Sequence, residues 1–451
     1  MGRNLLSRLR GVTGSDTGRA AELGIAAMVG NVVALAFTLV FTRVLGQSGY
    51  GSLGALISTF LLLTVAGYAL QTTVAREVSG AIAAGDPDAG RGVRRWLQRL
   101  VLLALGMAVV GVLARRPLAT VIGVEDVPWG AAATLPAGAL WLVLSVERGA
   151  LLGFQRYRLV GVSLVAEQTA RLVFGVVLAV AGLDVAGAFV GTPLALAAIA
   201  GALWVPLHRQ VAGVSDTELP GHRLRDLARR AWAPICALGM ISWLQDGNVI
   251  VVKHLATDHE AGAWVAAAVA AKAIMWIAIG LSAFLVPEVA RRAGGGEDAR
   301  PILLRVIALV AGLAVPMVLV YAVAAKPILV HILHVHGAEG ALPFFGLAMS
   351  MLALTYLATQ YQLALHRSRF LVVLALGGLA QPLIMVAVGG SRLTTLALGL
   401  LGLHVVVAAA MLTLALRHRS EPGDYVDEAD DATVAAATAS GEPVPPAPTA
   451  A

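Results

Sequence analysis

Runs of mostly apolar residues, each about twenty residues long, recur along almost the whole chain and limit its fold more than any other feature. A helix of that length crosses the hydrocarbon core of a bilayer, whereas the core of a soluble domain mixes shorter apolar runs with polar faces. The composition agrees, because 58% of the 451 residues are hydrophobic and 13% are charged. Soluble domains carry about a quarter charged residues. The sequence therefore predicts an all-α polytopic membrane protein.

Twelve membrane-spanning helices account for these runs. They are expected at 21–42, 50–70, 97–114, 128–146, 159–181, 186–207, 231–252, 262–287, 302–324, 342–363, 370–388 and 394–416. With the N-terminus in the cytoplasm, six of the 33 Lys and Arg residues fall in outer loops and two within spans, which leaves 25 on the cytoplasmic side. Because basic residues accumulate in cytoplasmic loops, both termini are predicted to be cytoplasmic. The abundant Ala, Gly and Arg, with three Lys, indicate a GC-rich bacterial genome and hence a bacterial cytoplasmic (inner) membrane.

Residues about 210 positions apart resemble one another, which suggests two tandem halves. The matching pairs are Arg43 with Lys253 and, after a one-residue slip, Gly51 with Gly262, Glu77-Val78 with Glu288-Val289, Gly85 with Gly296, and Arg94 with Arg305. The expected organisation is a basic cytoplasmic arm over 1–20, a six-helix bundle over 21–207, a cytoplasmic linker over 208–230, a second six-helix bundle over 231–416 and a tail over 417–451. The tail is acidic and then rich in Pro and Ala, a composition typical of disorder.

Four charged side chains lie deep within the expected spans and are candidate substrate-binding residues. Glu167 and Arg171 are four residues apart on one helix, so they share a face and can pair. Lys272 lies too deep to reach the interface by snorkelling, and Asp246 on the neighbouring span is its expected partner. Charges at membrane depth cost at least a few kcal/mol, which makes them functional candidates. The alternative for each pair is a structural ion pair.

Two further candidates, Arg43 and Lys253, occupy corresponding places in the two halves near the outer interface. Long basic side chains at that depth commonly extend to the lipid headgroups, so we expect both to be snorkelling anchors. Membrane lipids are accordingly expected partners.

Several other classes of function are disfavoured. Cys236 is the single cysteine, so neither a disulfide nor a Cys-based zinc site can form within one chain. The chain lacks GxxxxGK[ST], which argues against a self-contained ATP-driven pump. The net charge of +6 is spread over loops and does not indicate nucleic-acid binding. Asp86 and Asp88 are not expected to be catalytic. A metal site at His331, His334 and His336 is not expected either.

Three stretches resemble the polysaccharide-transporter branch of the multidrug/oligosaccharidyl-lipid/polysaccharide exporter superfamily. They are TRVLGQSGYGSLGAL followed by an Arg after the second span, ERGALLGFQRYRLVGVSLVAEQTARLVFGVVLAVAGL, and AKAIMWIAIGLSAFLVPEVARR with its Pro287. The resemblance implies two six-helix bundles around a central cavity, and alternating-access flipping of a polyprenyl-diphosphate-linked oligosaccharide to the outer leaflet. Envelope glycan polymerases and glycosyltransferases are the protein partners it implies. Arg171 and Lys272 are suited to hold the diphosphate.

Other functions remain open at this stage. If Glu167 and Asp246 neutralise Arg171 and Lys272, an ion-coupled exporter of small cationic molecules, of multidrug type, becomes the alternative. A membrane glycan polymerase or ligase is less favoured, because such enzymes commonly carry a sizeable outer loop and the outer loops here are short. A membrane scaffold for envelope assembly is a further possibility. No catalytic residue, cofactor or metal is expected.

Overall fold

The computed structural model describes residues 16–86, 88–214, 225, 232–388 and 392–417, and every regular element in them is a helix. The N-terminal half contains α2 (Asp16–Val44), α3 (Gly46–Ala83), α4 (Val93–Leu113), α5 (Arg115–Ile122), α6 (Pro128–Ala132), α7 (Thr134–Gly153), α8 (Tyr157–Leu178), the π-helical turn η1 (Ala179–Leu183) and α9 (Asp184–Val211). The C-terminal half contains α11 (Trp232–Ser242), η2 (Trp243–Gly247), α12 (Asn248–Leu255), α13 (Asp258–Ala271), α14 (Ala273–Gly294), α15 (Arg300–Lys326), η3 (Pro327–Ile332), α16 (Leu342–Ala364), α17 (Phe370–Val388) and α18 (Leu393–Arg417).

Ten helical segments of the described chain are long and apolar enough to cross a membrane. One of them, Tyr157–Val211, contains two passes, because the chain reverses at Gly182 and Asp184 between α8 and α9. Gly182 has a φ of +97°, which glycine adopts without steric cost. The described apolar part of α2, Met28–Val44, supplies one more pass. Together these segments agree with the twelve expected helices.

Three of the expected spans end too early. The second is expected to end at residue 70, but α3 continues to Ala83. The fourth is expected to end at residue 146 and the eighth at residue 287, but α7 continues to Gly153 and α14 to Gly294. Charged residues follow each of these expected ends, and in all three places the helix continues past them. The arm and the tail lie almost wholly outside the described residues, as does most of the linker, although α9 extends into the linker as far as Val211.

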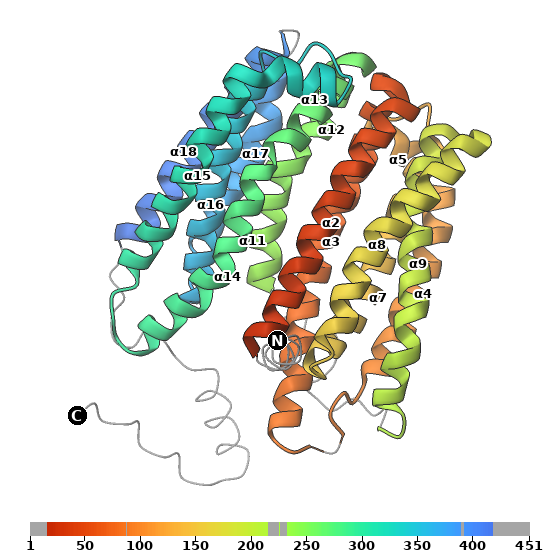
Figure 1. The fold of residues 1–451 in the computed structure, drawn as a ribbon, viewed down its shortest axis with the longest axis vertical. Helices are drawn as coiled ribbons and strands as arrows, with labels where there is room; N and C mark the ends of the chain where they lie inside the picture. The colour runs from red at the N-terminus through yellow and green to blue at the C-terminus, as the bar shows by residue number, and fades with distance from the viewer. Residues whose placement is uncertain (1–15, 87, 215–224, 226–231, 389–391, 418–451) are drawn as a thin grey trace, which may run out of the picture.

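The two halves form two groups of helices that meet along α3 (Figure 1). This helix packs against α11, η2, α12 and α13 of the other half. The backbones of the two halves come close where a Cβ on Gly51 would lie 2.7 Å from the Gly262 nitrogen, and a Cβ on Gly262 would lie 1.9 Å from the Gln47 carbonyl oxygen. A side chain at either glycine would push the halves apart. Glycine is therefore required here by close backbone approach.

The tandem repeat predicted from the sequence is visible in the backbone. Gly85 and Gly296 end corresponding helices with nearly the same φ, +72° and +71°. The N–H of Gly85 donates to the carbonyl of Ile82, and that of Gly296 to the carbonyl of Ala293. The same correspondence holds between the end of α7 and the end of α16, where Gln155 and His366 have φ values of +57° and +53°. The contact of Gly51 with Gly262 is thus a contact between equivalent residues of the two halves.

Candidate transport site

A buried ionic network joins α7 to α8 in the N-terminal half. Glu167 accepts from two guanidinium groups: its Oε2 lies 2.8 Å from Nη2 of Arg148, and its Oε1 lies 2.6 Å from Nη2 of Arg171. The side chains of Arg148 and Glu167 are 1% and 3% exposed, and that of Arg171 is 13% exposed. The expected pairing of Glu167 with Arg171 is therefore present. We call Arg148, Glu167 and Arg171 the N-half network.

Arg148 is held rigidly within this network. Its Nε donates to Oγ of Ser163 at 2.9 Å and its Nη2 to the carbonyl of Ser163 at 3.0 Å. The guanidinium also lies 5.7 Å from the ring centre of Trp141. Hydrogen bonds and a ring contact on three sides fix the orientation of Arg148, which makes it a structural member of the network.

Arg171 is held less completely. Its guanidinium lies over the ring of Phe60 at 4.8 Å and 5.9 Å from that of Trp141. Its Nε is buried without a hydrogen-bond partner. A spare donor on the most exposed member makes Arg171 the group of the N-half network best suited to contact a substrate.

Arg148 and its neighbour Glu147 are not among the site residues expected from the sequence. Both follow the expected end of the fourth span, which would place them in a cytoplasmic loop. Instead α7 carries both inward, where they are 1% and 2% exposed. The apolar residues that continue beyond them, Ala150 to Leu152, were the available signal. An adjacent acid and base therefore did not mark the edge of the membrane span.

A second ion pair lies in the C-terminal half, where Nζ of Lys272 contacts Oδ1 of Asp246. This is the partner expected for Lys272. The amide of Gln245 also donates to Oδ2 of Asp246 at 3.1 Å. Side-chain exposures are 2% for Asp246 and 13% for Lys272. We call Asp246, Lys272 and Gln245 the C-half network.

Both charged residues of the C-half network occupy irregular points in their helices. Asp246 lies in the π-helical turn η2, and Lys272 lies at the break between α13 and α14. Such breaks release backbone carbonyls that need donors inside a membrane. Tyr321 donates to the carbonyl of Ala270 at 2.7 Å, and Gln381 to that of Trp243 at 3.3 Å. The helix irregularities are thus stabilised by neighbouring helices.

Arg43 and Lys253 lie at the end of the molecule where the halves touch, but in different environments. Arg43 is exposed and donates to the carbonyl of Leu39 in its own helix at 3.3 Å, as an anchor can. The snorkelling prediction is wrong for Lys253, whose side chain is 2% exposed and pairs with Asp258. Its Cγ lies 3.0 Å from a Cβ position on Gly123 of the other half, so Lys253 is covered by protein instead of lipid.

The contact between the halves is reinforced at the same end by Gln47. Its Oε1 accepts from the N–H of His336 at 3.0 Å, while its Nε2 donates to the carbonyls of His336 and His259 at 2.9 and 2.8 Å. One amide side chain therefore ties α3 to two segments of the C-terminal half. Within the described residues, the histidines of the 331–336 motif join no group of three side chains that could hold a metal ion.

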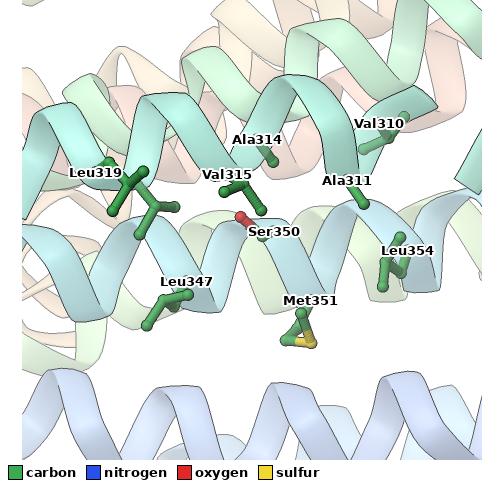
Figure 2. Close-up of a pocket in the computed structure, with 10 residues that line it drawn as sticks. Val310, Ala311, Ala314, Val315, Leu319, Leu347, Ser350, Met351 and Leu354 are labelled. Carbon is green, nitrogen blue, oxygen red and sulfur yellow. The ribbon is translucent and has the colours of Figure 1, made fainter. Parts of the chain in front are cut away.

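A groove of about 300 Å³ lies apart from both networks, between α15 and α16 (Figure 2). Its polar lining residue is Ser350, whose Oγ donates to the Gly346 carbonyl at 2.8 Å. The other lining residues are apolar: Val310, Ala311, Ala314, Val315, Val318, Leu319, Leu347, Met351 and Leu354. The groove can hold an apolar chain but offers no free polar group to select a ligand.

Comparison with solved structures identifies the fold. The chain is similar to an inward-facing multidrug resistance MATE family transporter of the MOP superfamily, with a TM-score of 0.74, 14% identity, and coverage of 88% of this chain and 97% of the other. An outward-facing MATE family transporter gives a TM-score of 0.58 at 14% identity, covering 90% of this chain and 96% of the other. A MOP superfamily transporter from Pyrococcus furiosus, described as having a binding pocket of reverse polarity, gives 0.58 at 13% identity over 90% and 96% of the two chains.

In sequence, no protein-family model matches the chain, and a comparison with curated proteins found no match. The likeness therefore establishes the fold of MOP superfamily transporters with two helical halves. The polysaccharide-transporter branch expected from the sequence motifs has no support among these neighbours, which are transporters of the MATE family or of the superfamily at large.

Proposed function

We propose that this protein is an alternating-access membrane exporter of the multidrug type. The observation that carries the proposal is the shape of the molecule, which matches the inward-facing multidrug transporter better than the outward-facing one, with TM-scores of 0.74 and 0.58. In the proposed orientation both termini are cytoplasmic, the membrane is the bacterial inner membrane, and the closed end that contains Gly51 faces outward.

Opening toward the outside requires that the halves separate at that closed end. The contact between Gly51 and Gly262 and the three backbone hydrogen bonds of Gln47 must then break. Because a packed interface has two discrete arrangements instead of a continuum, the halves are expected to move as rigid bodies about α3. The substrate is carried between them.

For a cationic cargo the proposed working groups are the carboxylates of the two networks, Glu167 and Asp246, because opposite charges attract. Arg171 and Lys272, each with a side chain 13% exposed, hold these carboxylates in ion pairs. The proposed cargo is a small organic cation. The carboxylates of the two networks, together with that of Glu147, then balance the positive charges of Arg148, Arg171 and Lys272. The aromatic rings of Phe60 and Trp141 beside Arg171 offer a flat apolar surface for such a molecule.

A flippase for a lipid-linked oligosaccharide is a second candidate function, favoured by a specific observation. The N-half network sets two guanidinium groups against one carboxylate, which leaves a surplus positive charge in a medium that disfavours it. A diphosphate would compensate that charge. If the cargo is a lipid-linked oligosaccharide, the groove between α15 and α16 can hold part of its apolar lipid chain.

Transport assays in proteoliposomes distinguish the two candidates. The multidrug proposal predicts saturable movement of the cation ethidium, and no movement of a fluorescent polyprenyl-diphosphate sugar between leaflets. Movement of the lipid-linked sugar without movement of ethidium would transfer the assignment to the flippase. Movement of neither by correctly folded protein would contradict both.

A further inference from the structure

Glu147 is a buried carboxylic acid that the two networks do not use. It lies in α7 and is 2% exposed, and its Oε2 has no hydrogen-bond partner. Six residues separate it from the end of α7 at Gly153, which places it about 9 Å inside the helix end. A carboxylate buried without a partner costs several kcal/mol. A bound proton removes that cost by neutralising the group.

The charged surroundings of Glu147 leave it without a compensating ion pair. Helices α3, α4, α8 and α9 pack against α7. Their ionisable side chains are Tyr50, Tyr68, Arg76 and Glu77 of α3; Arg94, Arg95 and Arg99 of α4; Tyr157, Arg158, Glu167 and Arg171 of α8; and Asp184, His208 and Arg209 of α9. Of these charged groups and those of α7 itself, Arg148, the next residue in sequence, is the one whose charge attracts an ionised Glu147 carboxylate. The guanidinium of Arg148 is already committed to Glu167 and Ser163.

We propose that Glu147 is a proton-binding site that sets the charge of the N-half network. When Glu147 is ionised, it and the network contain two carboxylates and two guanidiniums and are neutral. When it takes a proton from water, an O–H bond forms on the carboxyl and the sum becomes +1. The proton returns to water when the carboxyl ionises again, so no other reactant is consumed.

This charge change gives a coupling rule, which rests on the exporter function proposed above. A cation binds best to the neutral, deprotonated site and is repelled by the protonated one, so proton and cation compete. Competition for one site that faces the two sides in turn exchanges an inward proton for an outward cation. An anionic cargo would instead bind together with the proton.

The first test detects the proton itself and does not depend on transport. Infrared difference spectra of the purified protein, recorded between neutral and strongly alkaline pH, are expected to show the C=O band of a protonated carboxyl that ionises over this range. The band should disappear in Glu147→Gln, move in Glu147→Asp and persist in Glu125→Gln, which alters an exposed acid of the same half. An identical band in wild type and Glu147→Gln would overturn the assignment. The Glu147→Asp spectrum decides the matter if the Gln variant does not fold.

The second test measures coupling with ethidium as the probe. In proteoliposomes with an imposed pH gradient, Glu147→Gln, which fixes the charge of the protonated site, should lose gradient-driven accumulation to background and should also slow ethidium exchange at equal pH. Glu125→Gln should behave as wild type. Undiminished gradient-driven accumulation in Glu147→Gln would overturn the coupling role. If wild type moves no ethidium, the exporter proposal fails, and the infrared result still decides whether Glu147 binds a proton.

Discussion

The two halves of the protein share their backbone but not their buried charges. Equivalent helix ends such as Gly85 and Gly296 have the same φ and the same hydrogen bonds. Gly85 and Gly296 are 211 residues apart. At that offset Arg148 corresponds to Thr359 and Glu167 to Gly378, while Asp246 corresponds to Leu35 and Lys272 to Leu61. The repeat therefore determines the backbone of both halves, whereas the buried charged residues lie at different helix positions in each half. A site built between the halves is accordingly asymmetric in charge.

The largest effect is expected from breaking the centre of the N-half network. Glu167→Gln leaves two guanidiniums facing each other without a carboxylate, and loss of a buried partner typically costs about 3–5 kcal/mol. Asp246→Asn in the C-half network strands one ammonium instead of two guanidiniums, so its effect should be smaller. Thermal unfolding in detergent measures both. Equal loss of stability in the two variants would contradict the difference between the halves.

Filling the contact between equivalent glycines should come next. Gly262→Ala places a Cβ 1.9 Å from the Gln47 carbonyl oxygen, and overpacking typically costs about 1–3 kcal/mol. The cost falls on the closed arrangement, so the halves should separate at this end. Ser58 is 3% exposed and lies seven residues after Gly51, on the same face of α3. Accessibility of Ser58→Cys to a thiol reagent, measured in a Cys236→Ala background, reports this separation.

Gly280→Ala is the matched control for that variant. Gly280 belongs to α14, which continues from α13 beyond Lys272, and a Cβ there meets nothing within 4 Å. It should leave the accessibility of the Ser58→Cys site unchanged. If Gly262→Ala and Gly280→Ala behave alike, the glycine contact does not hold the halves together.

Removing the Gln47 side chain should have a moderate effect. Gln47→Ala loses three backbone hydrogen bonds between α3 and the C-terminal half, each worth about 0.5 kcal/mol in net terms because all three are exposed to water. The variant should populate the separated arrangement more than wild type but less than Gly262→Ala. The same thiol-accessibility assay ranks the three proteins, and a Gln47→Ala result equal to wild type would show that the glycines alone close this end.

The smallest effect is expected at Arg43, which differs from its counterpart in the other half. Arg43 is exposed and bonded only within its own helix in the described contacts, so Arg43→Ala should change stability by less than about 0.5 kcal/mol. Lys253→Ala leaves Asp258 unpaired and removes packing against Gly123, so its effect should be larger. Thermal unfolding of the two variants compares equivalent positions directly.

The sequence was sufficient for the fold and for two ion pairs but not for the complete networks. Apolar runs revealed the spans, and the i,i+4 spacing revealed the contact of Glu167 with Arg171. The depth of Lys272 identified Asp246 as its partner. Arg148 and Glu147 were missed because charges at the end of an apolar run resemble a membrane boundary, and only packing shows that α7 buries them. Lys253 was misassigned because depth alone does not reveal which neighbour covers a side chain.

The measurement that tests the central claim most directly follows both ends of the molecule at once. Spin labels at Glu125 and Lys326 report on the end where the halves touch, and labels at Gly80 and Arg291 report on the opposite end; all four positions are exposed. Pulsed electron–electron distances would be recorded in liposomes, in a Cys236→Ala background, before and after a pH step in the presence of ethidium. Alternating access predicts that one distance lengthens as the other shortens. Distances that stay fixed, or that change in the same direction while transport continues, would contradict the account.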